Sequence, residues 1–78
     1  MTNLETILNI MFKIKKICIS NENNTNLEEL ETDGNFLKFL FNELDEKFEV
    51  LSKKNQKDLK GLKDELFFNT KMIFRGHF

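Results

Sequence analysis

Only a few side chains in this sequence are of the types that perform catalysis or bind metal ions. His77 is the single histidine and Cys18 the single cysteine. A zinc site needs clustered nitrogen, sulfur or carboxylate ligands, and a histidine base needs a pocket and an orienting partner. Glu28, Glu29 and Glu31 are close in sequence, but in a helix they cannot all face one site. We therefore expect no catalytic residue, no metal site, no cofactor and no enzymatic activity.

The glycines and the cysteine have simple structural interpretations. Gly34 and Gly61 stand alone, so they do not form the glycine-rich loop that holds a phosphate group. A single cysteine cannot form a disulfide within the chain, and Cys18 lies among apolar residues, where a small buried side chain is expected. A lone thiol is typical of a reducing compartment, so we expect a cytoplasmic protein.

The element that must position any binding residues is the apolar stretch from Leu4 to Ile19. One set of its residues repeats at the spacing of a single helix face: Leu4, Ile7, Met11, Ile14 and Cys18. Other apolar residues widen this face: Leu8, Ile10, Phe12, Ile17 and Ile19. A domain of 78 residues has few neighbours to cover so wide a face. We therefore expect the surplus residues to contribute to an interface.

Three further helices are predicted from capping residues and apolar spacing. Thr25 and Glu28 fit a capping box that starts a short helix at residues 26–31, and Gly34 fits a left-handed helix end. The next helix is expected at residues 36–51, and the last, capped by Asn55, at residues 56–75. No stretch has the alternation of a strand. The sequence thus predicts an all-α fold, a single compact domain over residues 1–78 with three main helices and one short helix.

The two later long helices carry apolar stripes that we expect in the core. The first stripe is Leu37, Leu40, Phe41, Leu44, Phe48 and Leu51; the second is Leu59, Leu62, Leu66, Phe67, Thr70, Ile73 and Phe74. Phe39 and Val50 lie opposite the first stripe, and Phe68 and Met72 opposite the second. Adding Phe39, Phe68 and Met72 to residues of the first helix gives the candidate partner-binding residues: Leu4, Ile7, Leu8, Ile10, Met11, Ile14, Ile17, Phe39, Phe68 and Met72. A homodimer and a different protein partner both remain open.

The charge pattern argues against nucleic acid and membrane as partners. The formal net charge is −1, but residues 21–50 carry nine acidic residues and two lysines. The lysines at 53, 54, 57, 60 and 63 are interrupted by Asp58, Asp64 and Glu65, so we do not expect this chain to bind nucleic acid by itself. The stretch Leu4–Ile19 is too short and too charged to span a membrane. The acidic middle can steer a basic partner or face the basic last third.

Three blocks of the sequence resemble the AsiA family of phage anti-sigma factors. They are Asn3–Ile7, Asn35–Leu40 followed by Asn42 and Glu43, and Gln56–Lys60 continuing through Leu62 to Asp64–Leu66. The resemblance implies a small all-helical protein whose first helix forms a homodimer face. It also implies that this helix is exchanged onto the C-terminal region of the primary sigma factor, which blocks promoter recognition. The matching positions are Leu4, Ile7, Leu8, Ile10, Met11, Ile14 and Ile17.

The sequence therefore favours a small protein-binding inhibitor. Abundant Asn, Lys, Ile and Phe are typical of an AT-rich coding sequence, which fits a low-GC bacterium, a phage or another mobile element. We expect a phage or mobile-element origin and, for a phage-encoded protein, a location in the host-cell cytoplasm. The expected partner is the sigma factor of host RNA polymerase. Two alternatives remain: another phage inhibitor, such as an anti-CRISPR protein that uses the acidic middle segment, and a self-associating structural or DNA-binding accessory protein.

Overall fold

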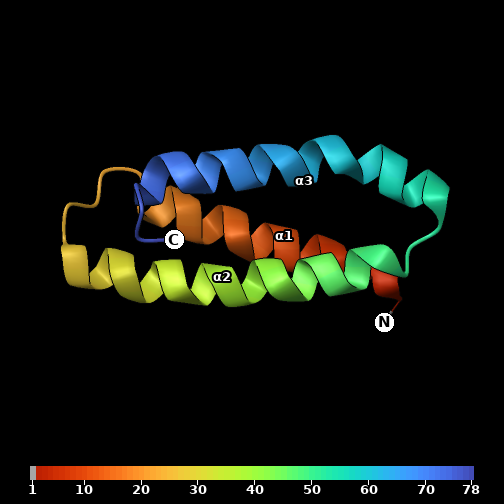
Figure 1. The fold of residues 1–78 in the computed structure, drawn as a ribbon, viewed down its shortest axis with the longest axis horizontal. Coiled ribbons are helices and arrows are strands. Elements are labelled where there is room, and N and C mark those ends of the chain that lie inside the picture. Colours follow the sequence, from red (N-terminus) through yellow and green to blue (C-terminus); the bar gives the residue numbers. More distant parts are fainter. Residues whose placement is uncertain (1) are drawn as a thin grey trace.

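The computed structural model describes residues 2–78 as three helices in an up-down-up arrangement. They are α1 (Asn3–Ser20), α2 (Leu27–Glu49) and α3 (Lys53–Phe74). Helices α2 and α3 lie side by side and antiparallel, and α1 packs behind them against both (Figure 1). The bundle measures 39 × 21 × 16 Å. The predicted all-α fold is confirmed, and no strand occurs in the part of the chain that the structure describes.

Each helix begins at a residue whose side chain accepts a hydrogen bond from the backbone three residues later. Thr2 caps α1, with its Oγ1 atom 3.1 Å from the Glu5 nitrogen. Helix α2 is capped by Asn26 rather than Thr25. Helix α3 is capped by Ser52 rather than Asn55, which is already inside the helix. The last helix therefore starts about one turn earlier than its apolar pattern indicates.

The prediction of a separate short helix is wrong, because α2 continues through Gly34 without a break. Gly34 is buried, and a β-carbon built on it would overlap the His77 carbonyl oxygen and lie 2.8 Å from the His77 carbonyl carbon. This glycine is therefore needed for the close approach of the C-terminal segment and does not end the helix. In sequence, the two uses of glycine look the same.

The core is formed by apolar residues of all three helices. Its buried members are Ile7, Ile10, Met11, Ile14, Cys18, Leu30, Leu37, Leu40, Phe41, Leu44, Leu51, Leu66 and Phe74. The predicted α2 stripe is confirmed, with Phe48 half-buried. Ile10 was expected to be surplus but is buried, because α1 packs against two helices and uses a wider arc. Leu62 and Phe67 were expected in the core but are exposed on the two flanks of α3.

Two buried polar residues connect the helices. Asn21, at the end of α1, donates through its amide nitrogen to the Ile17 carbonyl at 2.8 Å and to Asp33 of α2 at 3.0 Å. Its amide oxygen accepts from Asn24 at 2.8 Å. Thr70 of α3 donates to the Leu66 carbonyl at 2.7 Å. Among the described residues, every buried side-chain nitrogen and oxygen has a hydrogen-bond partner, so the core contains no unpaired polar site.

Candidate protein-binding surface

The ten predicted partner-binding residues fall into three groups in the structure. Four of them form the core: Ile7, Ile10, Met11 and Ile14. Leu4 and Ile17 are half-buried against that core. The exposed ones are Leu8, Phe39, Phe68 and Met72. The four buried residues cannot contact a partner in this conformation, contrary to the prediction that they belong to a binding surface. Their apolar character serves the packing of α1 between α2 and α3.

Several exposed apolar side chains lie along α1 and α3, and we call this surface the α1–α3 face. Its members are Leu8, Phe12 and Ile19 of α1, and Leu62, Phe68 and Met72 of α3. A groove of about 330 Å³ runs between the two helices. Ile19, Leu62 and Met72 line it, together with the charged residues Lys15 and Glu65. The groove is thus apolar, with charged side chains at its edges.

The α1 side of this face continues beyond the groove. Leu8, Phe12, Lys15 and Ile19 follow one stripe of the helix at spacings of four, three and four residues. Phe12 is 60% exposed, and the Lys16 ammonium lies 5.4 Å from the centre of its ring. Exposure of this apolar ring to water is unfavourable, and its burial against a partner would remove apolar surface from solvent.

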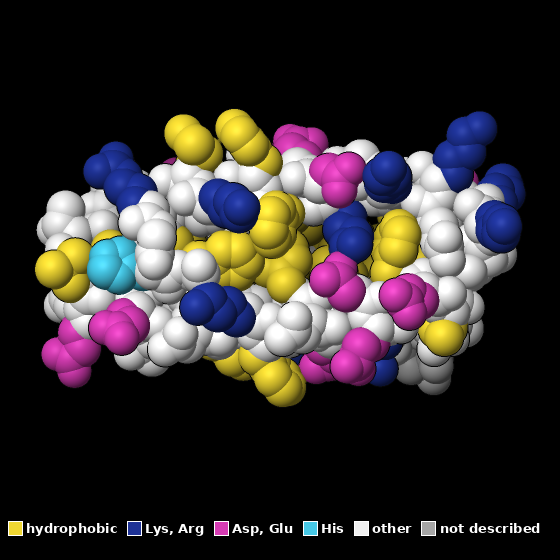
Figure 2. Space-filling model, viewed as in Figure 1, with side chains coloured by type: hydrophobic (Ala, Val, Ile, Leu, Met, Phe, Trp, Pro, Cys, Tyr) yellow, Lys and Arg dark blue, Asp and Glu magenta, His cyan; other side chains and the backbone are white. Residues whose placement is uncertain are grey.

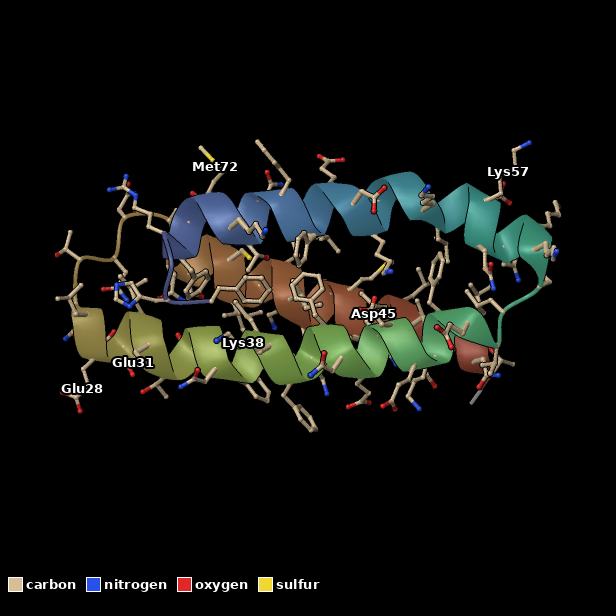
Figure 3. The ribbon with its side chains drawn as sticks, viewed as in Figure 1. Glu28, Glu31, Lys38, Asp45, Lys57 and Met72 are labelled. Atoms are coloured by element: carbon tan, nitrogen blue, oxygen red, sulfur yellow. The ribbon has the colours of Figure 1, made fainter. Side chains whose placement is uncertain are left out.

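On α3, the face includes two strongly exposed side chains, Met72 and Phe68. Met72 is 61% exposed and projects away from the bundle (Figure 3). Phe68 precedes it by one helical turn and is equally exposed. These two residues agree with the prediction that they lie outside the core.

Phe39 belongs to a different surface. It lies on α2 and stacks on Phe36 with ring centres 6.4 Å apart and planes inclined by 11°. Because α2 contributes nothing to the α1–α3 face, the structure does not unite Phe39 with Leu8, Phe68 and Met72. Two residues of the face, Phe12 and Ile19, were counted among the surplus apolar residues of the first helix but were not included in the ten predicted binding residues. Leu62 was missed because its spacing also fits the core stripe.

The charged residues form one ion pair among residues 2–78, in which the Lys63 ammonium lies 2.7 Å from Asp45. Most of the acidic middle segment therefore does not pair with the basic last third, although α2 and α3 are neighbours. Glu28 and Glu31 lie near one end of the bundle and Lys57 near the other (Figure 3). Asp45 is paired with Lys63, and Glu29 and Asp33 accept hydrogen bonds from Asn24 and Asn21, whereas Glu28 and Glu31 are exposed and available to a partner.

Cys18 lies at the bottom of the groove on the α1–α3 face. Its sulfur is 3.2 Å from the Thr70 hydroxyl oxygen. Burial is the main cause that raises the pKa of Cys18; the hydrogen bond with Thr70 lowers it, and the nearby Glu22 carboxylate raises it further. The thiol is therefore kept protonated and unreactive, as its interpretation as a buried apolar side chain predicted.

We expect Cys18 to react with a disulfide reagent such as DTNB far more slowly in the folded protein than in urea. Because the folded-state pKa is raised, the unfolded chain loses the thiol proton first as the pH rises. The contribution of the protonated Cys18 thiol to the free energy of unfolding is therefore present at neutral pH and is lost at about pH 9–10 and above. Urea denaturation at neutral pH and at about pH 9–10 measures this loss of stability. The loss should be smaller in Cys18→Ala. Labelling equally fast with and without urea would contradict the buried position.

Other kinds of site find no support in the described part of the chain. Residues 2–78 contain no group of three or more histidine, cysteine or acidic side chains placed to hold a metal ion. None of the three helices combines the length and apolar character needed to cross a membrane. No protein-family model, curated protein or solved structure matches the chain.

Proposed function

We propose that this chain is a small protein-binding inhibitor that docks through its α1–α3 face onto the primary sigma factor of a host RNA polymerase. The observation that carries the proposal is the gathering of large exposed apolar side chains beside an open groove. Contiguous apolar patches on a small protein typically mark partner surfaces. Aromatic side chains and methionine are favoured at such interfaces.

The choice of sigma factor as partner rests on the resemblance to the AsiA family. In that family the first helix makes the contact, and α1 supplies half of the exposed face here. The contact in our proposal uses Leu8, Phe12 and Ile19 on the outer stripe of α1, while the buried residues of α1 stay in the core. Docking then needs no opening of the bundle, which would expose the core to water.

Replacing Phe12 by alanine is expected to weaken sigma binding by about tenfold or more, because a central aromatic ring often dominates an interface. The thermal midpoint should change little, since the ring is exposed. Biolayer interferometry against purified primary sigma factor and core RNA polymerase measures the affinity. Phe36→Ala on α2 is the matched control and should bind normally. Failure of the unmodified protein to bind sigma factor or core enzyme would rule out this proposal.

A second candidate is an inhibitor, such as an anti-CRISPR protein, that presents acidic side chains in place of nucleic acid. It is favoured by the acidic residues of α2, of which Asp45 alone forms an ion pair in residues 2–78. Charge reversal at Glu28 and Glu31 separates the two candidates. It should abolish inhibition by an acidic surface and leave docking through the α1–α3 face unchanged. Sedimentation at micromolar concentration tests the remaining alternative, self-association.

A further inference from the structure

The C-terminal segment, residues 75–78, folds back over the space between α2 and α3 (Figure 1). Arg75 and Gly76 both have positive φ, at 46° and 93°, and they reverse the direction of the chain. The His77 nitrogen then donates to the Phe74 carbonyl at 2.9 Å. The backbone of His77 crosses α2 at Gly34, where any β-carbon would collide with it. This crossing places Phe78 against α2 and α3.

Phe78 sits on two other phenylalanines in an arrangement that we call the aromatic groove. Its ring centre lies 5.3 Å from that of Phe41 and 5.7 Å from that of Phe67, with both contacts edge to face. Phe41 and Phe67 are themselves 5.4 Å apart at 89°. Phe41 is buried and forms the floor, whereas Phe67 on α3 remains exposed beside the occupant. The groove is thus shaped to receive an aromatic ring.

The segment that fills this groove is held to α2 by packing contacts. Its backbone hydrogen bonds, Arg75 to the Lys71 carbonyl and His77 to the Phe74 carbonyl, remain within the end of α3. In the described part of the chain, no hydrogen bond joins the segment to α2. Arg75 is also a non-glycine residue in the left-handed conformation, which is unfavourable for a side chain with a β-carbon. Release of the segment would relieve this strain and break no hydrogen bond to α2.

Basic side chains lie beside the aromatic groove, and Asp45, Lys63 and Asp64 line the space next to Phe41 and Phe67. The Lys71 ammonium is 4.8 Å from the centre of the Phe67 ring. Lys38 lies on α2, across from α3 (Figure 3). Figure 2 shows basic side chains on both sides of the central hydrophobic patch. The charged side chains that the segment itself brings are those of Arg75 and His77, which are basic or neutral. A ligand with carboxylates beside its ring would pair with Lys38 and Lys71.

We propose that the aromatic groove binds an aromatic residue flanked by aspartate or glutamate in a partner protein, and that Phe78 occupies it until that ligand replaces it. The site lies between α2 and α3, so it is separate from the α1–α3 face and does not depend on the sigma-factor proposal. The C-terminal segment acts as an internal competitor. It lowers the apparent affinity for the ligand by the fraction of time that the groove is open.

The test uses fluorescence anisotropy with a labelled Glu-Glu-Phe-Glu-Glu peptide amide and three proteins. In Gly34→Ala, the added methyl group displaces His77 while alanine favours the helix, so the bundle should stay folded with the groove open. In Phe78→Ala, the competing ring is removed. Both variants should bind the peptide about tenfold more tightly than the unmodified protein, if the groove is open about a tenth of the time.

Two controls identify the groove and the ligand chemistry. Phe67→Ala placed in the Gly34→Ala protein should abolish the gain, whereas Phe36→Ala in the same background should keep it. A Gln-Gln-Phe-Gln-Gln peptide should bind more weakly than the acidic one, because it cannot pair with the lysines. Equal affinity of the three proteins for the acidic peptide would overturn the competition, and equal affinity for both peptides would overturn the acidic ligand.

Discussion

Replacing Leu44 with alanine is expected to destabilise the protein by about 2–5 kcal/mol, the range for a fully buried leucine. Leu44 is 0% exposed on the buried face of α2 and belongs to the core shared by all three helices. A chain of this length is stable by only about 4–12 kcal/mol, at ~0.05–0.15 kcal/mol per residue. The substitution should therefore remove a large share of the free energy of unfolding. Urea denaturation followed by circular dichroism measures the loss.

Phe39 provides the matched control for this prediction. It lies on the same helix and is larger than leucine, but it is 59% exposed. Phe39→Ala should cost less than about 1 kcal/mol, because little of the ring is removed from water in the folded state. Similar losses for Leu44→Ala and Phe39→Ala would show that the buried face of α2 is assigned wrongly.

The substitution Asn21→Asp is expected to cost about 2–4 kcal/mol, although it changes a single group. The amide nitrogen of Asn21 donates to the Ile17 carbonyl and to Asp33. An aspartate would place an acceptor against both of these acceptors, and a negative charge beside the Asp33 carboxylate. Asn21 is buried, so water cannot repair the loss. The side-chain hydrogen bonds by which residue 21 joins the end of α1 to α2 would therefore be lost.

The acidity of the solution gives this prediction a second readout. In Asn21→Asp, protonation of the introduced carboxyl group or of its neighbour Asp33 restores a hydrogen-bond donor between them. Lowering the pH from about 7 to about 4 should therefore narrow the difference in the free energy of unfolding between this variant and the unmodified protein. Asn23→Asp introduces the same charge in the same turn at an exposed position, and it should be nearly neutral. A loss in Asn23→Asp as large as in Asn21→Asp would attribute the effect to net charge.

Much of the fold follows from apolar spacing alone. The stripe of Leu37, Leu40, Phe41 and Leu44 specifies the buried side of α2, because residues at that spacing share one side of a helix. The length of α2 could not be predicted in the same way. Gly34 carries a pattern that usually ends a helix, and its real neighbour, His77, is at the other end of the chain. A contact so distant in sequence leaves no local signal.

The candidate surface was predicted in part for a related reason. Spacing shows that the apolar face of α1 is wide, but it does not show how much of that width the other helices cover. Ile10 and Phe12 are almost adjacent in sequence, yet Ile10 is in the core and Phe12 is on the surface. The position of α1 against two helices decides between them. Likewise, Leu62 and Phe67 are outside the core because they lie on the flanks of α3, beside its narrow buried stripe.

The up-down-up order of the helices has a practical consequence for handling the protein. An odd number of helices places the amino-terminal end of α1 and the carboxyl end of α3 at opposite ends of the bundle (Figure 1). An affinity tag or surface linker joined after Phe78 would be fused to the residue that packs on Phe41 and Phe67, and it would compete with that packing. Immobilisation through the amino-terminal end keeps the linker at the far end of the 39 Å bundle.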